Sequence, residues 1–211
     1  MTNGARARLL AVASLMSDQF TSQEKSKLLR YWENVAFLVF GLHRKDARTA
    51  VGDFTRAAQR VYLGEYSSVN EVKNALKDVA DGFGAEAAVD LIKANADSYT
   101  SWEEELRYLL ARYEEHLCKQ QGEKIAKEAW EKIWHVTPSK SIEHVFPQNP
   151  GSGWTGKLGR GQATEKHVHR LGNLILVPPG LNTKAGNHRF AKKREVYKNV
   201  PLRHVKEVAD K

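Results

Sequence analysis

A histidine with a carboxylate before it and two asparagines after it is the part of this sequence best suited to chemistry. Glu143 and His144 are adjacent, Pro147 closes the segment, and Asn173 and Asn182 follow nine residues apart. A neutral imidazole, with an unperturbed pKa of about 6.5, can accept a proton from water. A carboxylate and an amide oxygen can hold a divalent cation, and a second amide can fix the intervening loop. These residue types in this order indicate hydrolysis of phosphodiesters.

The same residues indicate which cation such a site would take. Magnesium prefers oxygen ligands and retains several waters, so one or two protein groups suffice. Glu143 and the amide oxygen of Asn182 meet that requirement and leave His144 free to act as a base. Adjacent residues of a regular strand point to opposite faces, so Glu143 and His144 can reach one site only where the strand ends or bulges. Pro147, three residues on, favours an early end.

Further motifs extend the pattern over residues 140–198. Residues 143–147 have the form Glu-His-x-x-Pro, residues 171–176 read Leu-Gly-Asn-Leu-Ile-Leu, and Asn182 is followed by Phe190 and Lys193. In these motifs the chain resembles HNH nucleases of the ββα-metal superfamily. More narrowly, it is similar to the C-terminal HNH domain of GmrSD-type modification-dependent restriction enzymes, a group that includes SspE-like phosphorothioate-sensing proteins.

The resemblance implies a role for each residue of the motif. His144 matches the general base, and Glu143 matches the acidic metal ligand before it. Asn173 matches the asparagine that orients the loop and the histidine, and Asn182 matches a metal ligand at the start of the finger helix. Many HNH proteins have a second histidine at this last position. An amide oxygen is a harder ligand, so asparagine favours Mg²⁺ or Mn²⁺ over zinc or nickel.

Each of these assignments has an alternative. Asn187 and His188 compete with Asn182 for the last ligand position. His144 could instead be a hydrogen-bonded core histidine, and Asn173, after a glycine, could serve only to shape a turn. Glu143 could likewise be an ordinary surface carboxylate, because acidic residues are mostly exposed.

The basic charge is concentrated in the part of the chain that carries the motif. Residues 136–211 hold 14 lysines and arginines against 5 acidic residues, whereas residues 1–135 hold 19 against 20. Such asymmetry predicts a polyanionic partner for the second part, with DNA the expected one. The candidate nucleic-acid contacts are Lys157, Arg160, His169, Arg170, Lys184, Arg189, Lys192 and Lys193. For any one of the helical residues, a solvated helix face is an equally good interpretation.

Composition limits the other classes of function. Apolar residues make up 41% of 211, which is enough for a packed core. The single cysteine, Cys118, excludes an internal disulfide and a cysteine-based zinc site, and it fits a reducing, cytoplasmic compartment. No apolar run approaches 18 residues, so no membrane contact is expected.

The expected fold is mainly α, with an N-terminal helical bundle followed by a C-terminal ββα-metal (HNH) finger. Residues 1–135 form the helical supporting region and residues 136–211 the basic nuclease region. Short strands are predicted at 141–146 and 174–177, and a short helix from Leu181. Three capping boxes predict helix starts in the first part: Thr21 with Glu24, Ser68 with Glu71, and Ser101 with Glu104.

The function expected from this sequence is that of a metal-dependent DNA endonuclease that nicks one strand, in restriction or anti-phage defence. Two alternatives remain: a catalytically inactive DNA-binding module, and an RNA-cutting HNH nuclease. No Gly-x-x-x-x-Gly-Lys-Ser/Thr phosphate loop is present. The resemblance therefore implies a partner, an NTPase and modification-sensing domain or subunit that this chain does not contain.

Overall fold

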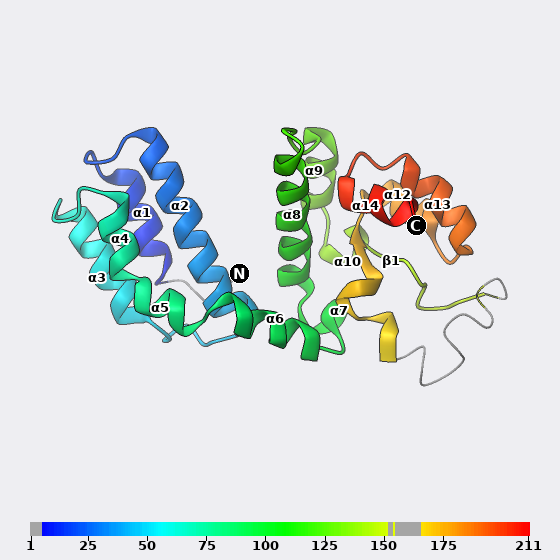
Figure 1. Cartoon of the computed structure of the whole chain (residues 1–211), viewed down its shortest axis with the longest axis horizontal. Helices are drawn as coiled ribbons and strands as arrows, with labels where there is room; N and C mark the ends of the chain where they lie inside the picture. The colour runs from blue at the N-terminus through cyan, green and yellow to red at the C-terminus, as the bar shows by residue number, and fades with distance from the viewer. Residues whose placement is uncertain (1–5, 152–153, 155–165) are drawn as a thin grey trace. The chain divides into compact units, whose positions relative to one another are not determined.

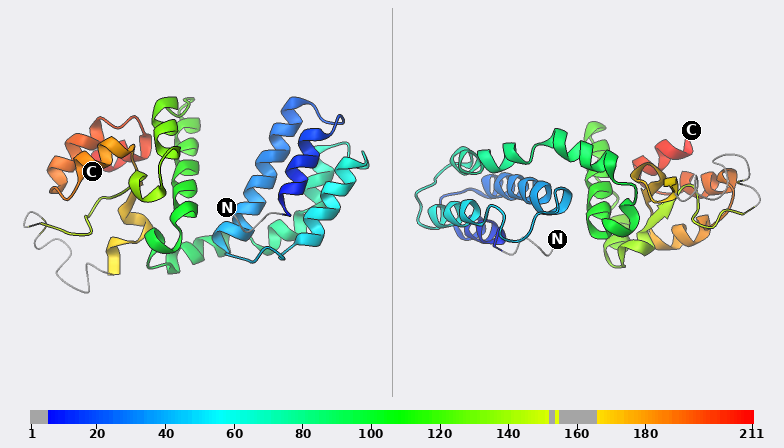
Figure 2. Two further views of the ribbon diagram at one scale, coloured as in Figure 1. Left: turned by 180° about the vertical axis from the view of Figure 1, so that it is seen from behind. Right: turned by 90° about the horizontal axis from the view of Figure 1, so that it is seen from below.

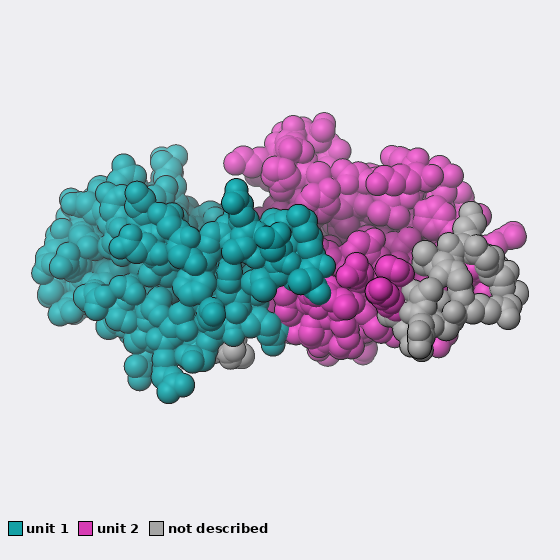
Figure 3. Space-filling view, turned by 60° about the horizontal axis from the view of Figure 1, so that its bottom comes forward, with its two compact units in different colours: residues 1–94 teal, residues 95–211 magenta. Residues whose placement is uncertain are grey.

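The computed structural model describes residues 6–151, 154 and 166–211. Two of the expected nucleic-acid contacts, Lys157 and Arg160, lie outside the described residues. The elements are labelled in Figure 1, and further views are given in Figure 2. The chain forms two compact units, residues 1–94 and residues 95–211, which are coloured separately in Figure 3. Among the described residues, no helix combines the length and apolar character needed to cross a membrane.

The first unit consists of helices around one apolar core. Its elements are α1 (Arg8–Met16), α2 (Ser22–Ala36), η1 (Phe37–Leu42), α3 (Val51–Tyr62), α4 (Val69–Ala75), α5 (Lys77–Gly82) and α6 (Ala85–Ala94). Helix α1 packs against α2 and α3, and Leu10, Leu28 and Phe54 are among the buried side chains at this junction. Buried residues recur at helical spacing within a helix, as Phe54, Ala58 and Val61 do in α3, which is why such segments fold as amphipathic helices.

Two of the three predicted capping boxes are confirmed. Thr21 accepts a hydrogen bond from the backbone of Glu24, whose side chain bonds back to Thr21, and Ser68 and Glu71 do the same at α4. The third prediction is wrong. Ser101 is the last residue of α7 (Ser98–Ser101), a helix capped by Asp97, and the next helix has no side-chain cap. Ser101 is itself helical and its hydroxyl donates to the backbone oxygen of Asp97, whereas an N-cap residue needs a non-helical backbone from which its oxygen can accept.

The second unit contains both strands of the described chain. Its remaining elements are α8 (Glu103–Gln120), α9 (Lys127–Trp134), α10 (Pro138–Ser141), β1 (Ile142–His144), η3 (Leu171–Asn173), β2 (Leu174–Leu176), α12 (Pro179–Ala185), α13 (Phe190–Lys198) and α14 (Arg203–Ala209). The expectation of a mainly α fold is confirmed.

The two strands form an antiparallel ladder in which every residue is buried. Ile142 pairs with Leu176, Glu143 with Ile175, and His144 with Leu174. The strands are shorter than predicted, although backbone hydrogen bonds from Val145 and Val177 continue the pairing at both ends. Pro178 cannot donate to the ladder, and Pro179 is the first residue of α12, a position that proline favours, so the chain turns into a helix there.

A buried acidic side chain explains why residues 95–135 belong with the basic region. Glu114, on α8, accepts hydrogen bonds from the backbone of Arg203 and from both the backbone and ring of His204, on α14. The other ring nitrogen of His204 accepts from the backbone N–H of Leu176 in β2. Helix α8 therefore holds the strands and the last helix together. The boundary between the two compact units lies between Ala94 and Asn95, whereas the charge and composition of the sequence change near residue 135.

Candidate active site

His144 ends strand β1, and both of its ring nitrogens have polar neighbours. Nε2 lies 3.2 Å from Nδ1 of His169, and Nδ1 lies 3.3 Å from Nε2 of Gln148. Only 5% of the residue is exposed. The imidazole is thus held from two sides.

Two aromatic rings pack against this histidine. The ring of Tyr99 meets that of His144 edge to face at 4.5 Å and stacks on that of His169 at 5.4 Å. The backbone N–H groups of Ser98 and Tyr99 both donate to the carbonyl oxygen of His169. The short helix α7 therefore positions a residue that lies about seventy positions later in the chain.

The environment keeps His144 uncharged at neutral pH. Burial lowers the pKa of its imidazole to about 4, and the nearby charge of Lys193 acts in the same direction. Removing a cation from water is costly, so the neutral ring is favoured. A neutral imidazole has one nitrogen with a free lone pair, which is the form required of a general base.

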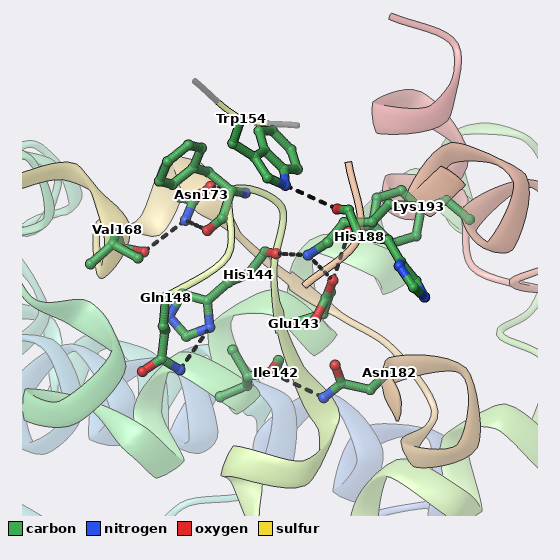
Figure 4. A network of polar contacts seen from close by, with 12 residues as sticks. Ile142, Glu143, His144, Gln148, Trp154, Val168, Asn173, Asn182, His188 and Lys193 are labelled. Carbon is green, nitrogen blue, oxygen red and sulfur yellow. Dashed lines mark hydrogen bonds and ion pairs between the residues drawn. The ribbon is translucent and has the colours of Figure 1, made fainter. Parts of the chain in front are cut away.

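The side chain of Glu143, in the middle of β1, points toward helix α13. Its Oε1 accepts hydrogen bonds from Nζ of Lys193, at 2.7 Å, and from the hydroxyl of Tyr197, at 2.9 Å. The Lys193 ammonium also donates to the backbone oxygen of His144. All three side chains are buried, so β1 and α13 are joined through a network removed from water. Figure 4 shows the carboxylate directed to Lys193 while the His144 ring faces Gln148.

Burial opposes charge on both members of this ion pair. It raises the pKa of the Glu143 carboxyl, against the attraction of Lys193, and it lowers the pKa of the Lys193 ammonium, against the attraction of Glu143. The position of Lys193 corrects one sequence-based prediction. Its side chain is wholly buried. It therefore does not belong to an exposed basic surface, and its ammonium pairs with Glu143 at the border of the cavity described below.

The side chain of Asn173 joins the segment that follows β1 to the segment that precedes β2. Its Oδ1 accepts from the backbone N–H of Phe146 at 2.7 Å, and its Nδ2 donates to the carbonyl oxygens of Phe146 and Val168 at 2.9 and 2.7 Å. These bonds use the whole amide, and they fix the chain immediately after His144. Such geometry is what a loop-orienting asparagine requires.

The amide of Asn182, on α12, is oriented by strand β1 and the residues before it. Its Nδ2 donates to the carbonyl oxygens of Lys140 at 3.0 Å and Ile142 at 3.3 Å. Carbonyl oxygens can only accept, so the amide nitrogen must face them and the amide oxygen must point elsewhere. In Figure 4 that oxygen is turned to the side on which Glu143 lies.

These residues border one cavity of about 280 Å³. Its lining includes Glu143, His144 and Asn182, together with Gln148 and Asn187. The two strand residues can border the same cavity because His144 is the last residue of β1, where the strand ends as Pro147 had suggested. Three of the four motif residues predicted from the sequence thus border one cavity, and Asn173 is not among the described residues that line it.

Comparison with known families decides the affiliation of the chain. Residues 86–211 match the family described as GmrSD restriction endonucleases, C-terminal domain. The chain belongs to this family. No curated protein and no solved structure matches it. The family description is that of a restriction endonuclease, and the match includes every residue that borders the cavity.

In this GmrSD C-terminal domain, the donor atoms at the cavity fit a hard divalent cation. The part of the chain that the structure describes holds no group of three or more His, Cys, Asp and Glu side chains arranged for a metal. The cavity instead presents a carboxylate from Glu143 and an amide oxygen from Asn182, two oxygen donors of the kind that magnesium accepts with few protein ligands. Of the alternatives to Asn182, Asn187 borders the cavity and His188 does not, within the described residues.

His188 has a different contact. Its backbone oxygen accepts from the indole N–H of Trp154 at 3.1 Å, and its side chain is exposed. Figure 4 shows this bond as a dashed line. The residue therefore contributes its backbone to the position of the segment between α12 and α13.

The remaining basic candidates differ in exposure. The exposed ones are Lys184 on α12, Arg189 immediately before α13, and Lys192 on α13, and none of them forms an ion pair with a described residue. Arg170 is half-buried, and its Nε is buried without a hydrogen-bond partner among the described residues. His169 is half-buried with its ring against His144.

Sequence reasoning missed three side chains of this site: Tyr99, Gln148 and Tyr197. Tyr197 had a signal, because it lies four residues after Lys193 and thus on the same helix face. Gln148 directly follows the Glu-His-x-x-Pro motif. Tyr99 had none, since it lies on a separate helix far from the motif in the sequence.

Proposed function

We propose that the second unit is a metal-dependent DNA endonuclease of the HNH type, with a ββα-metal arrangement of β1, β2 and α12. One observation carries the proposal: a neutral imidazole, a carboxylate and an amide oxygen border the same cavity. The family affiliation supports nuclease chemistry. The adjacent exposed cations on α12 and α13 support a polyanionic substrate.

In this proposal His144 is the general base. A ring nitrogen takes a proton from water while the water oxygen bonds to phosphorus. The bond from phosphorus to the 3′ oxygen breaks in line, and the departing oxygen takes up a proton from solvent. Asn173 keeps the loop after His144 in place through its bonds to Phe146 and Val168, so the imidazole stays at the cavity while the proton moves.

Glu143 and Asn182 would hold Mg²⁺ or Mn²⁺. When bound, the ion supplies positive charge that stabilises the phosphate oxygens and the leaving oxygen. Lys193 and Tyr197 fix the Glu143 carboxylate through its Oε1. Orientation of a ligand by groups behind it is a usual feature of metal sites, so these two residues would preserve the ligand geometry.

The exposed cations Lys184, Arg189 and Lys192 would bind DNA phosphates. Contacts of this kind set affinity and register and carry no base information. One finger cuts one strand at a time, so the proposed product is a nick, or a double-strand break where two copies act together. The proposed setting is defence against foreign or modified DNA, in which a modification-sensing, NTP-hydrolysing domain or subunit would be the partner.

A plasmid-nicking assay tests the proposal. Wild-type protein with Mg²⁺ should convert supercoiled plasmid to the open circular form, and His144→Ala should abolish conversion while retaining the circular dichroism spectrum and DNA binding. His188→Ala, an exposed histidine of the same unit, is the matched control and should cut normally. Wild-type cutting by His144→Ala would remove the proposed base. DNA binding without cutting by the wild type would favour a binding module, and preference for structured RNA over plasmid would favour an RNA nuclease.

A further inference from the structure

The two ring nitrogens of His144 face different surroundings. Gln148, which contacts Nδ1, borders the cavity, whereas His169, which contacts Nε2, is not among the described residues that border it. Nδ1 is therefore the nitrogen on the cavity side. A base that accepts a proton from water in the cavity must do so through Nδ1, and this requires that the ring's single hydrogen be on Nε2.

The hydrogen-bond partners of His144 also indicate that the ring's hydrogen is on Nε2. The side-chain nitrogen of Gln148 can only donate, so Nδ1 of His144 accepts from it. With Nδ1 as acceptor, the hydrogen of the neutral ring lies on Nε2 and is directed at Nδ1 of His169. The hydrogen of His169 must then be on its own Nε2.

From this geometry we infer that His169 is a positioning residue for the general base: its Nδ1 accepts the Nε2–H of His144 and so keeps the cavity-facing nitrogen free to take a proton. The inference rests on the proposed function of His144. It assigns to His169 a role distinct from the phosphate contact expected from its place in a basic segment. Water would replace the amide of Gln148 at Nδ1 when substrate binds.

His169 is built into the site in a way that suits this role. Its ring stacks on Tyr99 with an interplanar angle of 10°, and its carbonyl oxygen accepts from the N–H groups of Ser98 and Tyr99. The preceding residue, Val168, is bonded through its own carbonyl to Asn173. Both sides of His169 are thus fixed, so its Nδ1 has a set position relative to His144. The hydrogen bond that orients a base normally comes from such a fixed third group.

The contact also has a purpose after proton transfer. Once Nδ1 has taken the proton, both nitrogens of His144 carry hydrogen and the ring is a cation. A neutral His169 still accepts from Nε2–H and stabilises that cation by a charge-assisted hydrogen bond. His169 therefore favours both the starting tautomer and the product of the proton transfer, without gaining or losing a proton itself.

Three variants test the inference kinetically. His169→Ala removes the acceptor and should lower kcat about 10- to 100-fold with KM unchanged, the range typical of partners that orient a reacting group. His169→Asn places an amide oxygen close to the former Nδ1 and should restore most of the activity. His167→Asn, two residues earlier and exposed, is the matched control and should behave as the wild type. Wild-type rates for His169→Ala, in a protein that His144→Ala inactivates, would overturn the inference.

A second measurement does not depend on cutting. Long-range proton–nitrogen NMR correlations of the histidine rings report which nitrogen of His144 carries hydrogen. The expected result is hydrogen on Nε2 in the wild type and in His169→Asn, and a mixture of both tautomers in His169→Ala. Hydrogen on Nδ1 in the wild type would overturn the role of His169 whether or not the protein cuts DNA. Full activity of His144→Ala, in contrast, would overturn the proposed function and leave the NMR result to decide about His169.

Discussion

The ammonium nitrogen of Lys193 lies 2.7 Å from a carboxylate oxygen of Glu143, and both side chains are buried. The hydroxyl of Tyr197 binds the same oxygen. The pair joins β1 to α13 across fifty positions of the sequence, so the carboxylate that we propose as a metal ligand is positioned by α13. Both charged groups of this pair have been removed from water, so each depends on the other for its electrostatic stabilisation.

That dependence predicts a large stability effect. Lys193→Met keeps the length of the side chain but leaves the Glu143 carboxylate buried without its partner, and should lower the free energy of unfolding by about 3–5 kcal/mol. Urea titration followed by circular dichroism measures this. Lys192→Met changes the exposed neighbour and should shift the free energy by no more than about 0.5 kcal/mol. The double variant Glu143→Gln/Lys193→Met should recover part of the loss, and equal effects of the two lysines would contradict the buried pair.

The burial of Lys193 also shows where sequence reasoning ends. It lies between Lys192 and Arg194 in a helix rich in cations, and such a run normally indicates a solvated face. Only the packing of α13 against β1 distinguishes this lysine from its neighbours, and that packing is a long-range contact. The motif residues Glu143, His144, Asn173 and Asn182 could be predicted from the sequence, because their residue types and spacing are typical of a nuclease site. The fold brings three of them to one cavity.

The helical elements were predictable where the signal is local. The capping boxes at Thr21 and Ser68 each depend on four consecutive residues, and both are present. The cap at Ser101 is absent because Asp97 starts a short helix, α7, that includes Ser101, so this residue lacks the non-helical backbone of an N-cap. Tyr99 could not be predicted at all. Its importance comes from stacking on His169, which only the tertiary structure brings near.

The amide of Asn173 predicts a defined loss on conversion to an acid. Asn173→Asp keeps the shape but replaces the two donated hydrogen bonds with an oxygen facing the carbonyls of Phe146 and Val168. An unsatisfied buried polar group costs about 1–3 kcal/mol, so the melting temperature and kcat should both fall while DNA affinity changes little. Asn199→Asp is the control, since Asn199 is exposed and donates to a neighbouring carbonyl in its own helix. A wild-type melting temperature for Asn173→Asp would show that these bonds do not hold the loop.

Removal of divalent cations should stop nicking. The oxygen donors of Glu143 and Asn182 predict that EDTA abolishes activity, that Mg²⁺ or Mn²⁺ restores it, and that zinc restores it poorly because it favours nitrogen and sulfur ligands. The measurement is the initial nicking rate against free metal concentration. Asn182→Ala should raise the Mg²⁺ concentration needed for half-maximal rate by about 10-fold or more. Cutting that persists in EDTA would exclude the metal-dependent mechanism.

The exposed cations of α12 and α13 predict the salt dependence of DNA binding. Each phosphate contact contributes about 0.9 to the slope of log affinity against log salt concentration. Lys184→Gln/Arg189→Gln/Lys192→Gln should therefore reduce that slope by about three, with the same loss on every DNA sequence. Fluorescence anisotropy between 50 and 200 mM salt, the range over which such binding falls steeply, measures it. A control pair in the first unit, Lys27→Gln/Lys77→Gln, should leave the slope unchanged. An unchanged slope for the triple variant would mean that DNA does not bind to these three residues.

Acid stability should depend on Glu114. Burial alone would raise the pKa of this carboxyl, but hydrogen bonds from the His204 ring and from the backbone of Arg203 and His204 outweigh it and lower the pKa to about 2. A carboxyl whose pKa is lower in the folded state stabilises the fold fully above its unfolded value, about 4.5, and loses that contribution as the pH falls toward 2. The loss should approach about 3 kcal/mol, because each unit of pKa is worth about 1.4 kcal/mol.

Urea titrations at intervals between pH 5 and about pH 2.5 measure this loss, within the window that the pKa of Glu114 defines. Glu114→Gln cannot ionise, so it should be less stable than the wild type at pH 7 and should show a flatter pH profile in the acid range. Glu128→Gln, an exposed change on α9, should keep the wild-type slope. Parallel profiles for the wild type and Glu114→Gln would mean that the hydrogen bonds joining α8, α14 and β2 do not depend on the charge of Glu114.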